Sequence, residues 1–419
     1  MPHSDSIESD SKLAPGENID LPVGFGINLV AHVDANTGLG LTGRQKASLL
    51  IRHRVPLSIL GIRHELDQIQ PGWTLSSHIA QCVEDLKHPI NVYVLPAIRL
   101  TTLFQNYPGL LVPGRLHVAS FWWEMSRIPG PWLQQLSRFD GIIAESSFVA
   151  ELVRNSLPMV PVIQVKHPVS VPDGTRGNRS KFGLPDDAII FTVSLDPNSD
   201  PARKNPAAAV QAFRAAFPLS IGNAALVIRL NNADTAWGKE TTRILMQLAN
   251  GDPRIFLLTG AMGHDEVLSL YASSDVYVSL HRGEGLGLGL MEAMALGKPV
   301  IATGWSGNMS FMDSTCGCLV RYRHIAASGN YWFTQPGFVG PDAQWADPVM
   351  EDAVAWMRKL FEDKPYRLRI GRRAQERISS YQHEALGRMW IDEMIEIWRA
   401  SKFLPRVVEK YSSITTPAS

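Results

Sequence analysis

Two glutamates flank a glycine-rich stretch that could bind a polar ligand. The stretch reads EGLGLGLME, with Glu284 at its start, Glu292 at its end and three alternating glycines between them. Alternating glycines cost backbone entropy, so such a run without a ligand is unusual. Bare backbone N–H groups suit a phosphate, whereas a carboxylate beside a phosphate is favourable only if it accepts hydrogen bonds from neutral donors such as sugar hydroxyls. The stretch therefore predicts a nucleotide-sugar site, with amides for the diphosphate and one carboxylate for each flanking sugar.

The elements around this stretch should place it at the edge of a parallel sheet. DVYVSL (275–280) is typical of a strand, and GLMEAMALG (289–297) is typical of a helix that ends with Gly297 as a left-handed C-cap. Glu292 lies four residues after Leu288, on the same helix face and one turn deeper. In open α/β sheets, ligands bind where a strand's carboxyl end meets a helix N-terminus.

Two cations precede a second predicted helix start. Arg203 and Lys204 stand directly before Asn205 and Pro206, a pair typical of an N-cap and a first turn. Beside free amides, two positive charges would stabilise a diphosphate leaving group, whose charge grows in the transition state. Arg229 ends the run AALVIRL and could line the same cleft; a solvated arginine at a strand end is an equal alternative.

The long motif HRGEGLGLGLMEAMALGKPVIATGWSGN resembles the donor-site signature of retaining glycosyltransferases with two Rossmann domains (GT-B), glycosyltransferase family 4. The resemblance covers most of residues 188–320. It implies that Glu284 contacts the transferred sugar and that Glu292 contacts the nucleotide ribose. The amides that it implies for the sugar and the diphosphate are those of Gly285, Leu286, Gly287 and Leu288.

The same resemblance suggests roles for four further residues. Lys204 matches the family's cation on the diphosphate, whereas Arg203 is adjacent to it, where the family places its arginine five residues earlier. FWWEMSRIP (121–129) is similar to a W-x-E feature of bacterial members that build polysaccharide, so Glu124 is expected to hold the acceptor or to face the reacting carbon. Asn308, in TGWSGN, is near the donor sugar in the family; a turn-forming asparagine is an equal alternative.

A second glycine pattern, GLGLTG at residues 38–43, follows a predicted strand and precedes a helix. Alone it would suggest a dinucleotide site, with Glu65 at about the right distance onward. That gives an alternative function, an NAD-dependent oxidoreductase that uses Gly38, Gly40 and Gly43. Four extra residues separate the strand from the first glycine, so we favour a loop that faces the donor loop across the cleft, as in the resembled family, with Gly38 and Gly40 admitting sugar or phosphate.

Six short apolar runs before residue 167 and six after residue 187 predict two consecutive α/β halves with parallel sheets. An apolar stripe at steps of three and four predicts one further helix near the C-terminus, which could cross back to the N-terminal domain. The expected divisions are a disordered tail at 1–21, an N-terminal acceptor-binding Rossmann-like domain at 22–170, a linker at 171–187, a C-terminal nucleotide-sugar-binding Rossmann-like domain at 188–383, a helix at 384–403 and a tail at 404–419.

Composition limits the function further. The 419 residues contain 40 Lys and Arg against 40 Asp and Glu, so no net charge attracts nucleic acid. Three cysteines cannot make a disulfide framework and suit a reducing compartment. Neither a membrane-spanning run nor a signal-peptide core is visible. We expect a cytoplasmic protein, with attachment to the inner face of the membrane left open.

The residues and the resemblance together predict a metal-independent hexosyltransferase that needs no cofactor, and the resemblance implies that the reaction retains the anomeric configuration. The expected donor is a GDP- or UDP-sugar of mannose or glucose type. The expected acceptor is a glycan or a lipid-linked oligosaccharide in cell-surface polysaccharide assembly. A third alternative is a non-catalytic binding subunit of the same fold, against which the two glutamates and Lys204 argue.

Overall fold

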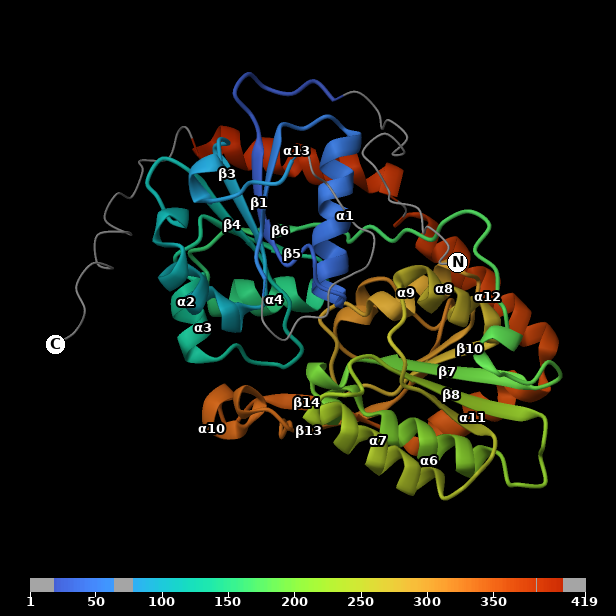
Figure 1. Cartoon of the computed structure of the whole chain (residues 1–419). Helices are drawn as coiled ribbons and strands as arrows, with labels where there is room; N and C mark the ends of the chain where they lie inside the picture. The colour runs from blue at the N-terminus through green and yellow to red at the C-terminus, as the bar shows by residue number, and fades with distance from the viewer. Residues whose placement is uncertain (1–18, 64–77, 382, 402–419) are drawn as a thin grey trace.

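The computed structural model describes residues 19–63, 78–381 and 383–401. Residues 1–18 of the expected N-terminal tail, the expected tail at 404–419 and Glu65 lie outside these ranges. Two six-stranded parallel sheets form two Rossmann-like halves, as the alternation of apolar runs predicts (Figure 1). Within the described residues, no helix is long and apolar enough to cross a membrane.

The N-terminal sheet has the strand order β2-β1-β3-β4-β5-β6. Every residue of β1 and β3 is buried, as expected for parallel strands covered on both faces. The strands are β1 (Ile27–Ala31), β2 (Leu57–Gly61), β3 (Ile90–Val94), β4 (Leu116–Ser120), β5 (Gly141–Ala144) and β6 (Val162–Gln164). The helices are α1 (Gly38–Arg52), η2 (Val83–Asp85), α2 (Ala97–Asn106), η3 (Pro108–Leu110), α3 (Gly130–Leu136) and α4 (Ser147–Ser156).

The C-terminal sheet has the order β12-β11-β10-β7-β8-β9. Its strands are β7 (Ile189–Leu195), β8 (Ala224–Leu230), β9 (Ile255–Leu258), β10 (Val276–Ser279), β11 (Val300–Thr303) and β12 (Cys318–Val320). The helices of this half are η4 (Ser180–Phe182), η5 (Pro197–Ser199), α5 (Pro201–Lys204), α6 (Pro206–Ala216), α7 (Ala236–Ala249), α8 (His264–Ser273), α9 (Leu288–Ala295), η6 (Gly307–Ser310), α11 (Met350–Glu362) and α12 (Lys364–Ser379).

In both sheets the strand order reverses beside the first strand, between β1 and β3 and between β7 and β10. Loops that leave neighbouring strands in opposite directions at such a point open a crevice at the carboxyl edge of the sheet. In the C-terminal half, β7 leads to the segment that ends at Lys204, and β10 leads to the glycine stretch. The topology therefore brings the two segments selected from the sequence to the same edge.

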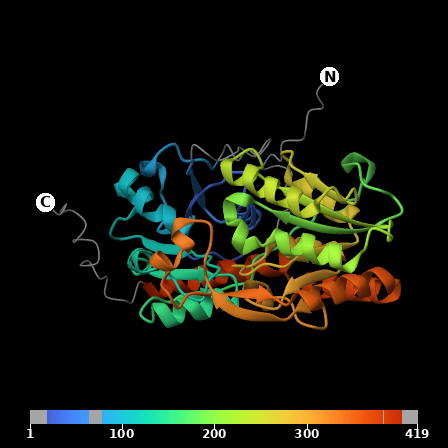
Figure 2. The ribbon, with the colours of Figure 1, turned by 90° about the horizontal axis from the view of Figure 1, so that it is seen from below.

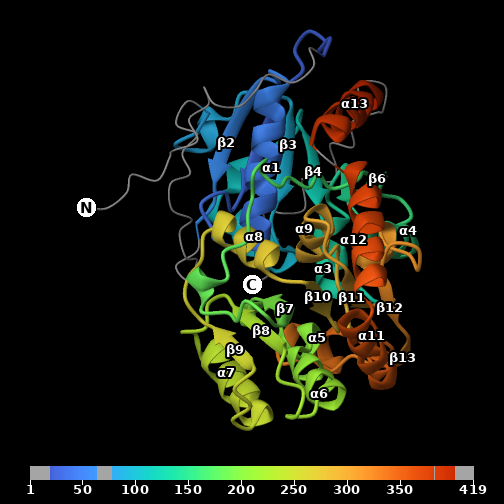
Figure 3. The same ribbon diagram turned by 90° about the vertical axis from the view of Figure 1, so that its right-hand side faces the viewer.

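The last helix, α13 (His383–Ser401), returns to the N-terminal half, as its apolar stripe allowed. Trp390, Ile391 and Met394 join the core cluster that α1 and the N-terminal sheet form. Trp398 meets Phe25 edge-on, with ring centroids 5.8 Å apart. Figure 3 shows α12 beside the C-terminal half and α13 beside the N-terminal half. The chain thus crosses between the halves again after the linker.

One substructure was not predicted from the sequence. Residues 322–348, here called the excursion, form an antiparallel pair, β13 (Tyr322–Ala326) and β14 (Gln344–Pro348), with η7 (Trp332–Thr334) and α10 (Pro336–Val339) between them. The excursion leaves the C-terminal half and lies along the N-terminal half (Figure 2). Trp345 shares a core cluster with Trp132 of α3, and Gln344 N donates to Ser126 Oγ at 2.8 Å.

Candidate active site

The predicted donor-site stretch folds as a strand, a bend and a helix, as its sequence indicates. Strand β10 ends at Ser279 and α9 begins at Leu288. Gly287 has a φ of +102° and Gly297 a φ of +69°, values that side chains rarely adopt. The left-handed C-cap expected at Gly297 is therefore confirmed. Leu286 is buried in the core beneath the bend, so its backbone, rather than its side chain, is available to a ligand.

Glu284 occupies the centre of the site and is 7 % exposed. Its Oε1 accepts a hydrogen bond from Lys204 Nζ at 2.5 Å, and its Oε2 lies 3.7 Å from Arg203 Nη1. Burial alone would raise the pKa of Glu284, but Lys204 and then Arg203 outweigh it and lower the pKa to about 2. Glu284 is therefore a carboxylate that accepts hydrogen bonds and has no proton to donate near neutrality.

Arg203 is buried and connects several loops. Its Nη1 donates to Gly283 O at 2.8 Å, and its Nη2 donates to Ser199 O at 2.7 Å. The carboxylates of Glu124 and Glu284 lie 3.6 Å and 3.7 Å from the same guanidinium. Arg203 thus holds the surrounding loops and carboxylates in place. A contact between Arg203 and a diphosphate stays a prediction.

The N-terminal half meets the glycine stretch through the loop after β4. A Cβ added at Gly283 would lie 2.1 Å from Glu124 O, and one added at Gly285 would lie 3.2 Å from Trp122 Cβ. Ser146 Oγ donates to Gly285 O at 2.7 Å. These glycines therefore allow the backbone of the N-terminal half to approach the glycine stretch closely. The sequence analysis attributed the glycines to a ligand alone, because spacing cannot tell which neighbour needs the room.

Glu292 is 5 % exposed on α9, and its Oε1 lies 2.7 Å from Nε2 of His264, the first residue of α8. Burial, the largest single effect, lowers the pKa of His264, but the charge and hydrogen bond of Glu292 together with the charge of Asp265 outweigh it, so the net shift is upward. No local pattern in the sequence indicates this long-range pair.

Two further candidates lie at strand ends. Arg229 donates to Ser194 Oγ at 3.5 Å and to Asn231 Oδ1 at 3.2 Å, and its Nε is buried without a hydrogen-bond partner among the described residues. Asn308 is fully buried; its Nδ2 donates to Thr303 O at 3.0 Å and its Oδ1 lies 3.2 Å from His281 Nε2. The expected contact of Arg229 with a ligand therefore stays a prediction, whereas the geometry of Asn308 matches the turn-forming alternative.

The N-terminal glycines lie inside the first turns of α1, which corrects the expected loop. Thr37 caps this helix by accepting from Gly40 N at 3.1 Å, so the helix starts earlier than expected. A Cβ at Gly40 would lie 2.0 Å from Ala35 O, whereas one at Gly38 would have Leu288 Cδ1 as its nearest neighbour, at 3.8 Å. Gly38 therefore faces the donor bend, whereas Gly40 lets the chain pass close to the backbone of Ala35 in the turn before α1.

The fold has counterparts among solved structures. The sucrose-phosphate synthase of Thermosynechococcus elongatus matches with a TM-score of 0.66 at 16 % identity, covering 90 % of this chain and 100 % of that one. Anabaena HepE in complex with UDP-glucose matches with a TM-score of 0.56 at 15 % identity, covering 90 % and 100 %. The two facing Rossmann-like halves are therefore those of the GT-B fold.

A family match falls in the half that carries the glycine bend. Residues 208–329 match the family described as "Glycosyl transferases group 1". This segment of the chain is therefore similar to group 1 glycosyltransferases. The sulfoquinovosyl transferase SQD2 of Arabidopsis thaliana is 32 % identical over 142 residues, which are 34 % of this chain and 23 % of that protein. The chain thus matches less than a quarter of that relative's length.

The C-terminal half contains site contacts that sequence reasoning missed. Ser306 adopts a φ of +77°, and its Oγ accepts from Glu284 N at 2.8 Å. In the excursion, Thr334 Oγ1 donates to Asp200 Oδ2 at 2.8 Å. Asp200 also accepts from Ala202 N at 3.0 Å, in the short helix that ends at Lys204. The contacts of Ser306 with Glu284 and of Thr334 with Asp200 join segments far apart in sequence, so no local spacing could have revealed them.

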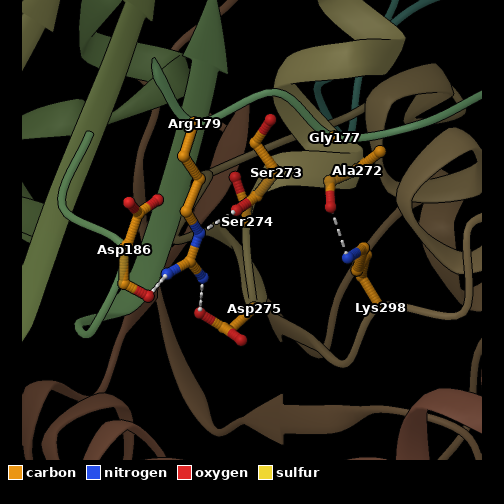
Figure 4. A pocket seen from close by; sticks show the side chains of 8 residues that line it. All are labelled: Gly177, Arg179, Asp186, Ala272, Ser273, Ser274, Asp275 and Lys298. Carbon is orange, nitrogen blue, oxygen red and sulfur yellow. Dashed lines mark hydrogen bonds and ion pairs between the residues drawn. The ribbon is translucent and has the colours of Figure 1, made fainter. Parts of the chain in front are cut away.

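A polar pocket of about 440 Å³ lies at the other edge of the same sheet (Figure 4). Arg179, from the expected linker, donates to Asp275 Oδ2 at 2.8 Å and to Asp186 O at 2.6 Å. Lys298 Nζ donates to Ala272 O at 2.8 Å. Asp275 and Lys298 precede β10 and β11, whereas Glu284 follows β10, so this pocket anchors the linker and is separate from the donor bend.

Proposed function

We propose that this chain is a retaining glycosyltransferase that moves a hexose from a nucleotide-diphosphate sugar to a carbohydrate acceptor. The observation that carries the proposal is the placement of two buried carboxylates, Glu284 and Glu292, at the two ends of one glycine bend, with Lys204 on the first of them. The bend lies at the switch point of a parallel sheet, where ligands of such sheets bind.

The proposed roles follow from charge. Lys204 and the N-terminal amides of α9 stabilise the diphosphate as it leaves, because both place positive charge where negative charge grows. Glu284 accepts hydrogen bonds from the transferred sugar, and Glu292 accepts them from the ribose. Glu284 is ionised and cannot protonate the leaving group, since its pKa is lowered to about 2.

The transfer itself is proposed as a same-face substitution. The bond between the anomeric carbon and the β-phosphate oxygen breaks, and the acceptor oxygen bonds to that carbon from the same side. The acceptor's proton passes to an oxygen of the leaving diphosphate, so no enzyme nucleophile is required. Closure of the two halves excludes water that would otherwise hydrolyse the donor.

The donor is proposed to be a UDP-hexose. Support comes from the neighbours of this fold, since HepE is described in complex with UDP and glucose, and TarM of S. aureus in complex with UDP. GDP-mannose is the competing donor. We further propose that the reaction needs neither metal nor cofactor, because Lys204 and the helix N-terminus supply the charge.

The acceptor is proposed to bind the N-terminal half beside Glu124, whose side chain is 25 % exposed and faces Arg203 across the junction. A glycan or lipid-linked oligosaccharide of cell-surface polysaccharide assembly is the proposed class, with the protein in the cytoplasm at the inner face of the membrane. The expected N-terminal domain at 22–170, linker at 171–187 and C-terminal domain at 188–383 are the proposed division of these roles.

A panel of UDP- and GDP-sugars tests the proposal by calorimetry and by release of nucleoside diphosphate. We expect one sugar nucleotide to bind the wild type, with turnover lowered at least about 100-fold in Lys204→Ala and Glu292→Ala. Lys181→Ala, which removes a half-exposed ion pair with Glu266, is the matched control and should keep wild-type turnover. Wild-type turnover in both site variants would refute the assignment, and stabilisation by NAD alone would favour the oxidoreductase that uses Gly38, Gly40 and Gly43.

A further inference from the structure

Glu292 shares its carboxylate with a histidine from another helix. His264 Nε2, at the start of α8, lies 2.7 Å from Glu292 Oε1, and the two side chains are 25 % and 7 % exposed. The pair joins α8 to α9, and Figure 3 shows both helices beside the end of α1. Of the two carboxylate oxygens, Oε2 is the one that the histidine does not contact.

The geometry matters because a carboxylate has about four sites for hydrogen-bond donors, two on each oxygen. A ribose offers two neighbouring hydroxyl groups as donors. A glutamate side chain that must meet them pays rotamer entropy unless another group already fixes its orientation. His264 is placed to fix it from the protein side.

We propose that His264 is a positioning residue for the nucleotide ribose: it holds Oε1 of Glu292 so that Oε2 faces the ribose, and its protonation makes donor affinity depend on pH. This inference rests on the proposed function, because it concerns the binding of the same donor. It assigns to His264 a role that the two glutamates alone would not predict.

The charged groups that face His264 set the direction of the pH effect. They are Glu292 from α9, Asp265 of its own helix and Arg44 from α1. Burial lowers the pKa of His264, Glu292 and Asp265 raise it, Arg44 lowers it, and the net shift is upward. His264 is therefore charged below this raised pKa and loses its charge as the pH rises through it. The charge-assisted hydrogen bond then weakens, so donor affinity should fall on the alkaline side.

Calorimetric titration with UDP-glucose and GDP-mannose as probes can measure this effect. Both phosphates of a nucleotide-sugar are esterified, so the ligand does not titrate in the range where histidine does, about pH 5 to about pH 8. For the wild type, we expect the Kd of the probe that binds to rise about fivefold across this range, because a charge-assisted hydrogen bond is replaced by a neutral one.

Two amide variants separate positioning from folding. In His264→Gln the side-chain NH2 can still reach Glu292, so we expect a Kd within about twofold of the alkaline wild-type value and no pH dependence. In His264→Asn the amide is one methylene shorter and cannot reach, so we expect a Kd about tenfold higher at every pH. His88→Gln is the matched control, because His88 precedes β3 and lies at the edge of the N-terminal sheet away from the site. This variant should keep the wild-type dependence of Kd on pH.

The outcomes distinguish this inference from the proposed function. A His264→Gln variant that keeps the wild-type pH slope, or a His264→Asn variant that binds as tightly as wild type, would overturn the inference and leave the proposed function intact. Failure of the wild type to bind these probes or any other member of the panel of UDP- and GDP-sugars would overturn both. A flat profile in the Gln variant together with weak binding in the Asn variant would establish it.

Discussion

Arg203 of the C-terminal half lies 3.6 Å from the carboxylate of Glu124, which belongs to the N-terminal half. The same guanidinium donates to two backbone carbonyls and lies beside Glu284. A single buried cation therefore orders groups from both halves around the proposed reaction centre.

Removing this cation should destabilise the protein strongly. Arg203→Ala leaves two carboxylates short of a partner and removes the donor to the buried carbonyl of Gly283 and the half-buried carbonyl of Ser199, so we expect a loss of about 3–5 kcal/mol in the free energy of unfolding. Arg243→Ala, which breaks a half-exposed surface pair with Glu240, should destabilise the protein far less. Urea unfolding of both variants measures the difference, and equal losses would contradict the framework role of Arg203.

Replacing Gly283 by alanine should separate the two halves at the site. The added Cβ would lie 2.1 Å from Glu124 O, a backbone atom that can move only with its loop. A displacement on the order of 1 Å at a reaction centre costs about 100-fold in turnover. Gly222→Ala, where an added Cβ meets nothing within 4 Å, is the control. Turnover in Gly283→Ala close to that of the control would show that the contact is unimportant.

Because the pKa of Glu284 is lowered to about 2, its ionised carboxylate should stabilise the folded protein above the ordinary pKa of 4.5. This stabilisation should be lost as the pH falls toward about 2. The unfolded chain binds this proton more tightly than the folded chain, so a lower pH favours unfolding. Acid unfolding followed by circular dichroism should therefore be less steep between these values in Glu284→Gln than in wild type. The same variant should lose at least about 100-fold in turnover, and an unchanged acid transition would argue against the ion pair with Lys204.

The excursion should influence donor binding at a distance. Thr334→Val removes the hydroxyl that donates to Asp200 and leaves that buried carboxylate with one partner fewer, at a cost of about 1–3 kcal/mol. Because Asp200 caps the short helix that carries Lys204, we expect the donor Kd to rise with it. Thr175→Val, on the linker surface, removes a similar hydroxyl and should change neither stability nor Kd. A Kd unaffected by Thr334→Val would show that the loop is fixed without the excursion.

The sequence predicted what depends on local pattern. All twelve strands of the two large sheets could be predicted, because parallel strands buried on both faces appear as continuous apolar runs. The sequence also indicated that Lys204 and Glu284 lie close together, because both follow strand ends at the same edge of the sheet. Asn205 precedes α6 as expected, but its side chain donates to Leu280 O and leaves the helix N-terminus uncapped.

What depends on pairing across the chain could not be predicted. Nothing near His264 indicates Glu292, and nothing near Gly283 distinguishes a ligand from Glu124 as the neighbour that needs the space. The excursion was missed because β13 is largely exposed and presents no apolar run. Its partners, Trp132 and Ser126, lie in the other half of the chain and become neighbours only after folding.

The excursion has a mechanical consequence for the motion that admits substrates. Together with the linker and α13, it joins the halves at three separate places, so they cannot swing apart about a single hinge. Either the aromatic contact between Trp132 and Phe338 gives way, or the excursion travels with the N-terminal half and bends where its two strands rejoin the C-terminal sheet. In the second case, residues near 321 and 349 form a pair of hinges. We then expect entry of the proposed donor to depend on how far these hinges bend.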